Sequence, residues 1–431
     1  MNSMVVNSGL MATVLAMASF VLSAGTTAMG ADPTKQSVLA NLPPKLKRLV
    51  EDSSSSDPNE RGKAVDAIGS LGESGAPAVP FLIPLLYDHA STDYDTRKGT
   101  PVSNRVRGAL VRIGKPAVGP CIQSLKQATR IMRFVLINQL GAFNDPEALD
   151  ALGTLLHDSD PEVGFSVVTE IAECTDSRAT GYLLDGLKTG NDVVRTWCAW
   201  HLGSRRDSRV LEALIEARKD GSESVRESVA RSLGEQRDRR ALPALLERFE
   251  DSKENEGVRR HAAEALGKIG DTRGIDSLLR AISDQRFTEP LRCSMAEGLG
   301  FSRDQRVVER LLTIAEDEHD AIHVRAASLR AIGNLGAEAT IPRLEGIALA
   351  SNNDEQVRFW AAMSMVKIVD GAIDNAAVVE HLQNYYDAHD CREAVMDRAK
   401  LRLMELDKVA KNGKSEAARL AARKLLEKLS Q

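Results

Sequence analysis

The stretch "VRRHAAEALGKIGDTRGIDSLL" (Val258–Leu279) contains the pattern that decides the fold. In its first half the apolar residues are spaced by four, three, one and three positions, which places them on one face of an α-helix. These residues are Val258, Ala262, Ala265, Leu266 and Ile269. One such helix cannot bury its apolar face alone, so we expect it to pack against further helices.

The second half of the stretch predicts a turn and another helix. Gly267 and Gly270 favour a helix end or the close approach of a neighbouring segment. Asp271 is a typical N-cap for the helix that follows. That helix again has one apolar face, formed by Ile275, Leu278, Leu279 and Ile282. We therefore predict a unit of two amphipathic helices.

The same pattern recurs along the chain at nearly fixed spacing. Positions equivalent to Arg259 are separated by 31, 31, 31, 33, 33, 33 and 33 residues. They are Arg133, Gly164, Arg195, Arg226, Arg259, Arg292, Arg325 and Arg358. Such self-similarity is typical of solenoids, and it predicts an all-α, right-handed α-solenoid of about ten stacked two-helix repeats.

The repeated pattern V-R-x-x-A-A-x-A-L-G-x-I-G-D-x-R-x-I-x-x-L-L closely resembles HEAT-like repeats of the phycobiliprotein-lyase type. The resemblance extends over about Asp57–Asp370. It implies that the helices beginning with Val-Arg line a concave face. It also implies a ladder in which a turn aspartate pairs with the following Val-Arg arginine, interrupted at Gly164. The expected pairs are Asp251/Arg259, Asp284/Arg292 and Asp317/Arg325.

The N-terminal end differs from the repeats. Residues 1–30 contain no charged side chain, and they include the apolar run Leu10–Ala24 followed by small residues. This composition is typical of a signal peptide, cleaved here after Gly30. An uncleaved N-terminal membrane anchor is the alternative, because the uncharged stretch approaches the length of a spanning helix. We expect a periplasmic or secreted protein.

The remaining segments follow from composition and periodicity. Residues 31–56 are expected to form a linker and a leading helix, and residues 57–370 the solenoid. A polar segment at 90–104 has no helical period and predicts an insertion loop. Residues 371–431 are expected to form capping helices that are net basic, with 11 basic and 6 acidic residues between 392 and 431. These helices either cap the last repeat or dock on an acidic partner or a membrane surface.

Common catalytic and metal-binding motifs are missing from the sequence. It contains no phosphate-binding loop, no nucleophile elbow and no cysteine pair at zinc spacing. His319 and His323 straddle a predicted turn, and none of the eight histidines is followed by the glutamate that HEAT-like deoxyhypusine hydroxylases use for iron. Cys174 and Cys198 fall at core positions and are expected to be free thiols. We therefore predict no catalytic residue, no metal and no cofactor.

Candidate binding residues come from the first and fifth places after the Val-Arg arginine, which are expected to point away from the apolar stripe. Trp197 is added from beside the edge of that stripe. Aromatic and arginine side chains on a concave surface are typical of interface hot spots. The alternative is that Phe134, Phe165 and Trp197 only pack against adjacent helices. The candidates are Phe134, Phe165, Trp197, Trp200, Arg231, Arg260 and Arg330.

The nearly balanced charge of the chain argues against a general nucleic-acid-binding function. With 56 basic and 61 acidic residues, a net charge of −5, no general field attracts the protein to nucleic acid. We predict an exported, non-catalytic interaction scaffold that binds a protein or peptide on its concave face, and we expect a monomer. Loop 90–104 and the basic C-terminal helices are alternative binding segments. The alternative function is an enzyme or accessory cofactor-handling protein related to HEAT-like lyases.

Overall fold

The computed structural model describes residues 33–92, 99–350 and 352–370. The chain divides into two compact units between Ala151 and Leu152. The regular structure described is almost entirely helical, which confirms the predicted all-α solenoid of stacked helix pairs. The predicted signal peptide at 1–30 and the predicted capping helices at 371–431 lie outside the described residues.

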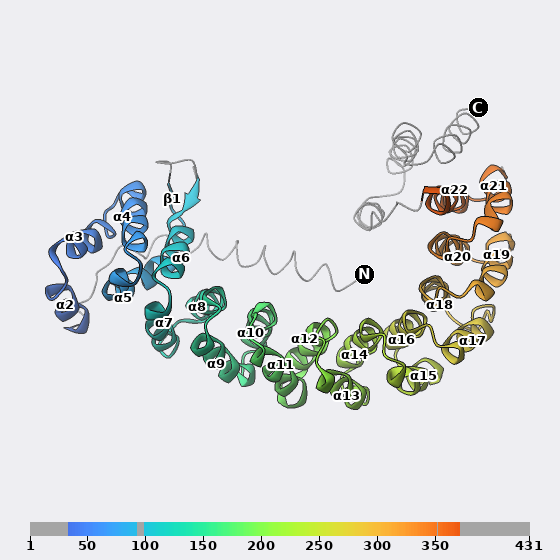
Figure 1. Ribbon diagram of the computed structural model, residues 1–431, viewed down its shortest axis with the longest axis horizontal. Helices are drawn as coiled ribbons and strands as arrows, with labels where there is room; N and C mark the ends of the chain where they lie inside the picture. Colours follow the sequence, from blue (N-terminus) through green and yellow to red (C-terminus); the bar gives the residue numbers. More distant parts are fainter. Residues whose placement is uncertain (1–32, 93–98, 351, 371–431) are drawn as a thin grey trace. The chain divides into compact units, whose positions relative to one another are not determined.

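The first unit is a series of short helices joined by turns (Figure 1). They are α2 (Pro33–Ala40), α3 (Pro44–Asp52), α4 (Pro58–Ser70), α5 (Val79–Leu82), α6 (Val102–Ile113), α7 (Val118–Leu125) and α8 (Arg130–Phe143). Helix α9 (Pro146–Thr154) crosses the division between the units. The segment 31–56, where we expected one leading helix, therefore contains both α2 and α3.

The polar segment at 90–104 contains a short antiparallel ladder. Strand β1 (Ser91–Thr92) pairs with β2 (Thr100–Pro101). The side chain of Arg105, which is 1% exposed, fixes this ladder to the helices. Its Nε donates to Thr92 Oγ1 at 2.6 Å, and its Nη1 donates to Asp66 of α4 at 2.8 Å. Helix α6 begins at Val102, so the insertion ends earlier than the sequence indicated.

The second unit repeats one helix pair many times. Figure 1 shows its even-numbered helices on the inner side of the curve of this unit and the odd-numbered helices on the outer side. The inner helices are α10 (Pro161–Glu173), α12 (Asp192–Leu202), α14 (Glu223–Gln236), α16 (Glu256–Ile269), α18 (Glu289–Phe301), α20 (Ile322–Leu335) and α22 (Glu355–Asp370). The outer helices are α11 (Arg178–Thr189), α13 (Ser208–Ala217), α15 (Leu242–Glu250), α17 (Thr272–Ala281), α19 (Val308–Glu316) and α21 (Ile341–Leu349). We call the surface formed by the inner helices the inner face.

Each inner helix packs directly on the next one, and in several repeats a glycine eight residues after the Val-Arg arginine lies at the contact. A Cβ atom on Gly234 would lie 2.7 Å from Ala265 Cβ, and one on Gly300 would lie 2.8 Å from Ala331 Cβ. Neighbouring inner helices therefore approach most closely at this glycine, because it has no side chain. The predicted close approach is confirmed. Gly270, at φ +69°, ends α16 with the left-handed conformation that glycine adopts easily.

The predicted core stripe of α16 is buried except at its end. Val258, Ala262, Ala265 and Leu266 are at most 1% exposed, whereas Ile269 is only partly buried. Asp271 accepts a hydrogen bond from the backbone N–H of Arg273, as expected of an N-cap.

The cysteines agree with the register of the repeat. Cys174 and Cys198 are buried and free, which confirms the prediction for both, and Cys121 is buried as well. Cys391 lies outside the described residues. Within the described ranges, no helix combines the length and the apolar character that crossing a bilayer requires.

The recurring arginines form a ladder between repeats, but the predicted partners are wrong. No ion pair joins Arg292 to Asp284 in the described structure; Arg292 instead binds Asp320, 28 residues later. The same step of 28 residues joins Arg226 to Glu254 and Arg325 to Asn353, and a step of 25 residues joins Arg195 to Asp220. The forward partner is favoured because stacking places the turn before the next inner helix beside the arginine.

The turn aspartates that we had paired with these arginines form hydrogen bonds within their own turns instead. Asp251, Asp284 and Asp317 each accept the backbone N–H two residues later. At Gly164, where the ladder was expected to break, a Cβ atom would lie 2.5 Å from Val194 Cγ2. Helix α12 therefore occupies the space that a side chain at position 164 would need.

Candidate binding surface on the inner face

An aromatic cluster lies on the inner face where α10 and α12 meet. Phe165 of α10 and Trp197 of α12 have ring centroids 4.8 Å apart, and the Trp197 ring is 6.1 Å from that of Trp200. The ring centroid of His201 lies 6.4 Å from that of Trp197. Trp200 is 39% exposed, whereas Phe165 and Trp197 are partly buried. The cluster therefore presents an indole ring to solvent above an apolar base.

Arg231 of α14 extends this cluster towards the next repeat. Its guanidinium carbon lies 3.3 Å from the centroid of the Trp200 ring, which is a close cation–π contact. Burial lowers the pKa of Arg231, although the nearby charges of Glu235 and Glu264 favour its charged form. Among the described residues, no hydrogen bond or ion pair reaches this guanidinium.

Beyond Arg231 the charged side chains on the inner face contact oppositely charged or polar neighbours. Lys268 Nζ lies 2.6 Å from Glu235 Oε1. Arg260 donates to Ser294 Oγ at 3.3 Å, and this hydroxyl donates to Glu264 at 3.1 Å.

The pairing continues on α20. Arg330 forms an ion pair with Glu297, and its guanidinium also lies 5.5 Å from the ring centroid of Trp360 on α22. These pairs neutralise the α16–α20 part of the surface locally.

Several titratable groups in this row have shifted pKa values. Burial raises the pKa of Glu264 and of Glu297 against the opposing effect of nearby cations. Burial, with the charges of Arg260, Arg231 and Lys268, lowers the pKa of His261 to about 4. These shifts follow from desolvation beside a row of paired charges.

The structure separates the seven predicted binding residues into groups. Phe165, Trp197, Trp200 and Arg231 form one cluster. Arg260 and Arg330 lie on the same face, and each contacts a polar or acidic side chain of a neighbouring helix.

Phe134 is not part of that arrangement. It lies on α8 in the first unit, where its ring is 5.6 Å from the guanidinium carbon of Arg130.

Sequence reasoning did not select Glu235, His261, Lys268 or Trp360, although all four take part in this surface. Lys268 and Glu235 occupy the ninth place after their Val-Arg arginine, one helical turn beyond the fifth place that we used. His261 and Trp360 occupy the second place, which is also that of Trp197. Including the ninth place, one helical turn after the fifth, and the second place of every repeat would have identified these four residues.

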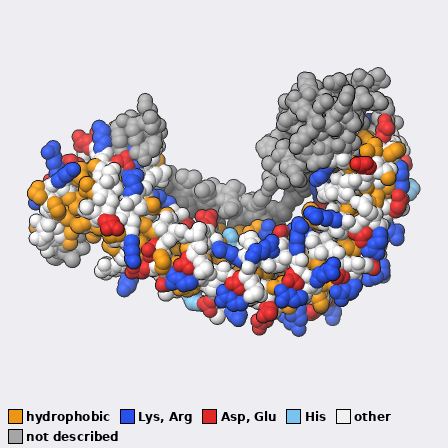
Figure 2. All heavy atoms as spheres, in the orientation of Figure 1, with side chains coloured by type: hydrophobic (Ala, Val, Ile, Leu, Met, Phe, Trp, Pro, Cys, Tyr) orange, Lys and Arg blue, Asp and Glu red, His pale blue; other side chains and the backbone are white. Residues whose placement is uncertain are grey.

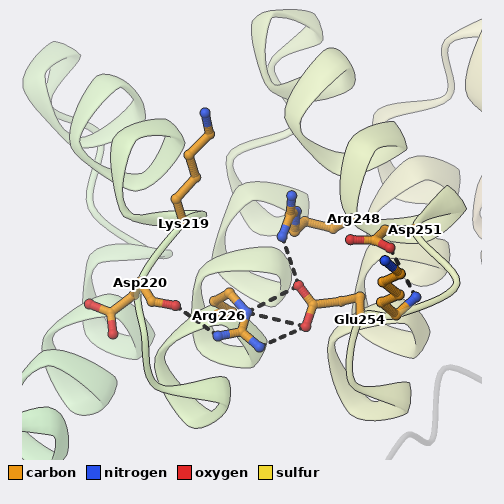
Figure 3. Close-up of a pocket in the computed structure, with 7 residues that line it drawn as sticks. Lys219, Asp220, Arg226, Arg248, Asp251 and Glu254 are labelled. Atoms are coloured by element: carbon orange, nitrogen blue, oxygen red, sulfur yellow. Dashed lines mark hydrogen bonds and ion pairs between the residues drawn. The ribbon is translucent and has the colours of Figure 1, made fainter.

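A separate pocket of about 250 Å³ lies near the turns before α14 and α16 (Figure 3). It is lined by Lys219, Asp220, Arg226, Arg248, Asp251, Lys253 and Glu254. The Glu254 side chain, 2% exposed, accepts hydrogen bonds from Arg226 Nη2 at 2.7 Å and Arg248 Nη1 at 2.9 Å. Burial acts to raise the pKa of Glu254, but these bonds bring it below its ordinary value. The pocket is thus part of the ladder that joins repeats.

No group of three or more His, Cys, Asp or Glu residues suited to a metal ion occurs among the described residues. His323, which the sequence placed four residues after His319, instead pairs through Nδ1 with Glu289. On the visible face in Figure 2, Lys and Arg side chains of the second unit are interspersed with Asp and Glu. That face therefore shows no extended field of one sign.

The family of the chain is now clear. A family model of HEAT repeats matches residues 119–203, 181–255, 211–289 and 285–366. These matches cover more than half of the sequence, and the chain therefore belongs to the HEAT-repeat family. The resemblance inferred from the repeated pattern is confirmed. A search of curated proteins finds no match.

Solved structures with a similar fold include both assemblies and enzymes. The Kap95:Nup1 complex matches with 15% identity and a TM-score of 0.53, covering 92% of this chain and 58% of that chain. The complex of CpcE and CpcF of phycocyanin lyase from Nostoc sp. PCC7120 matches with 18% identity and a TM-score of 0.37, covering 55% and 93%. Human deoxyhypusine hydroxylase in complex with glycerol matches with 19% identity and a TM-score of 0.28, covering 58% and 96%. At these identities the likeness concerns the fold alone.

Proposed function

We propose that the protein is a non-catalytic scaffold that binds a protein or peptide segment along the inner face of its second unit. The observation that carries this proposal is the exposed ring of Trp200, supported from below by Trp197 and covered from one side by Arg231. A large aromatic side chain held rigidly at the surface loses little conformational entropy on binding.

The repeat architecture supports the same conclusion. Each inner helix adds one row of side chains to a continuous surface, which suits an extended segment rather than a compact small molecule. The shifted pKa values of Glu264, Glu297 and His261 arise from burial beside paired charges, and they need no catalytic explanation.

Partner capture from living cells tests the scaffold. The full chain would be crosslinked to its neighbours in its native host, in parallel with the variant Trp200→Ala/Arg231→Ala and with a deletion of residues 93–98. We expect partners that the wild type and the loop deletion retain and that the double variant loses. Circular dichroism and thermal unfolding would verify that all three chains are folded. Equal capture by the double variant would contradict an inner-face site, and loss on loop deletion alone would move the site to the insertion.

We also propose that the protein is exported. The support is the uncharged, apolar composition of residues 1–30. N-terminal sequencing of the protein from separated cell fractions tests this directly. We expect a chain that begins at Ala31 in the periplasm or the medium. A chain that keeps Met1 and stays in the cytosol would contradict export, and one that keeps Met1 in the membrane fraction would indicate an anchor.

A further inference from the structure

We infer that Trp200 and Arg231 together recognise a carboxylate that lies next to an apolar side chain, so that the bound segment is an acidic peptide. This inference rests on the proposed function and specifies the chemistry of its partner. It concerns the side chains at one junction, between α12 and α14.

The first argument is the geometry of the guanidinium. With its carbon 3.3 Å from the Trp200 ring centroid, Arg231 covers the indole at van der Waals distance. A guanidinium carries its five N–H donors around its edge, so covering a ring leaves those donors available. No described residue accepts a hydrogen bond from them. A carboxylate is the acceptor that matches this planar edge with two parallel bonds.

The second argument is that the neighbouring carboxylates are engaged elsewhere. Glu235 is bound by Lys268 at 2.6 Å. Glu264 accepts from Ser294 at 3.1 Å and lies 4.0 Å from His261 Nδ1. Glu227, one helical turn before Arg231 on α14, forms no ion pair with it in the described structure. Arg231 therefore retains a partly buried positive charge without a direct partner, and a carboxylate ligand would supply one.

The third argument is the apolar surface beside this charge. Trp200 is 39% exposed, and the rings of Trp197 and Phe165 continue the apolar base below it. An aliphatic or aromatic side chain of the ligand can pack there while its neighbouring carboxylate binds Arg231. The two contacts together define a short motif of one acidic and one apolar residue.

The charge pattern favours a peptide over a polyanion. Lys268 and Arg330, two further cations of the inner face, are already paired with Glu235 and Glu297, and Arg260 is bound to Ser294. A nucleic acid needs a continuous row of available cations, whereas one carboxylate needs only Arg231.

Selection from a display library of random ten-residue peptides tests the inference. The baits would be the full-length wild type, Arg231→Gln, and the matched control Arg240→Gln, which removes an exposed arginine paired with Asp238 between α14 and α15. We expect the wild type and the control to enrich peptides with Asp or Glu beside an apolar residue. We expect Arg231→Gln to lose the acidic preference.

A double-mutant cycle on one enriched peptide makes the test quantitative. Replacing the acidic residue of the peptide by its amide should weaken binding to the wild type about tenfold or more. The same replacement should have little effect on Arg231→Gln. Thermal unfolding would verify that the variant is folded.

The outcomes separate the two proposals. If the wild type enriches peptides without an acidic preference, or if Arg231→Gln keeps that preference, the inference is wrong and the scaffold stands. If the wild type enriches no peptide and captures no partner in cells, the scaffold itself is wrong.

Discussion

Arg292 and Asp320 form a two-pronged ion pair inside the solenoid, with N···O distances of 2.6 and 2.5 Å and side chains that are 2% and 3% exposed. Arg292 Nε also donates to the carbonyl of Ile282 at 2.7 Å. One side chain thus joins the end of an outer helix, the start of an inner helix and the following turn. The pair therefore connects neighbouring repeats through backbone as well as side-chain contacts.

Removing the carboxylate should destabilise the protein strongly. Asp320→Ala leaves Arg292 buried without its counter-charge, and we expect a loss of about 3–5 kcal/mol in the free energy of unfolding. Asp276→Ala is a suitable control, because its pair with Arg306 is 3.5 Å long and solvent-exposed, and it should change stability by less than about 1 kcal/mol. Urea unfolding measures both. Similar effects of the two substitutions would show that the buried pair has no special role.

Two glycine substitutions should have opposite effects. A Cβ atom on Gly267 would collide with the backbone of Gly298 on the next inner helix, whereas one on Gly346 meets nothing within 4 Å. We expect Gly267→Ala to destabilise by about 1–3 kcal/mol and Gly346→Ala, inside α21, to stabilise by about 0.5–1 kcal/mol. Thermal and urea unfolding measure the difference. If Gly267→Ala were tolerated, the close approach of the inner helices would not need glycine.

His261 should make stability depend on pH. Its pKa is about 4 in the folded chain, below the ordinary value of 6.5, because of burial and three neighbouring cations. Between these values the unfolded chain binds a proton that the folded chain does not, so stability falls as the pH decreases through this window.

The size of the effect is measurable by comparison with His261→Gln. Because the side chain is 35% exposed, we expect roughly 1–2 kcal/mol rather than the full value of the shift. The difference in unfolding free energy between wild type and variant, measured at about pH 7.5 and about pH 4.5, isolates this histidine. An unchanged difference would mean that His261 titrates normally.

Cys121, Cys198 and Cys293 should be unreactive in the folded protein. Burial raises the pKa of Cys121 to about 12 and that of Cys293 to about 12, and it also raises the pKa of Cys198. The nucleophilic thiolate is therefore scarce at about pH 8. In a Cys391→Ser background, a colorimetric disulfide reagent should label these thiols slowly, and should label all four described cysteines after denaturation. Rapid labelling of Cys121 or Cys198 in the native protein would contradict their buried positions.

The repeat was predictable because it rests on local rules that act along the chain. The spacing of Val258, Ala262 and Leu266 defines a buried helical face, and Asp271 starts the next helix wherever its neighbours lie. The partner of Arg292 was not predictable in this way. Asp284, eight residues earlier, and Asp320, 28 residues later, are both acidic, and only the stacking of units decides between them.

The candidate surface was predictable only in part for the same reason. The register placed Trp200 and Arg231 on one face, but their stacking depends on the distance between α12 and α14. The pairing of Lys268 with Glu235 also joins residues that are 33 positions apart. Phe134 and Phe165 have equal positions in their repeats, yet they belong to different compact units. Sequence patterns define which way a side chain faces. They do not define which side chain of the next helix it contacts.

The junction between repeats has a consequence for how the chain can change length. Gly267 and Arg292 each meet the following unit, at Gly298 and Asp320. Gly300 with Ala331 and Arg226 with Glu254 form the same two kinds of contact at other boundaries. A tandem duplication of one complete 33-residue unit, such as that of Arg292, would therefore place a glycine and an arginine on one side of the new boundary and their partners on the other side. Copying half a unit would leave a buried arginine facing no acid. Growth and shortening by whole units would lengthen or trim the inner face one row at a time, while Trp200 and Arg231 keep their arrangement.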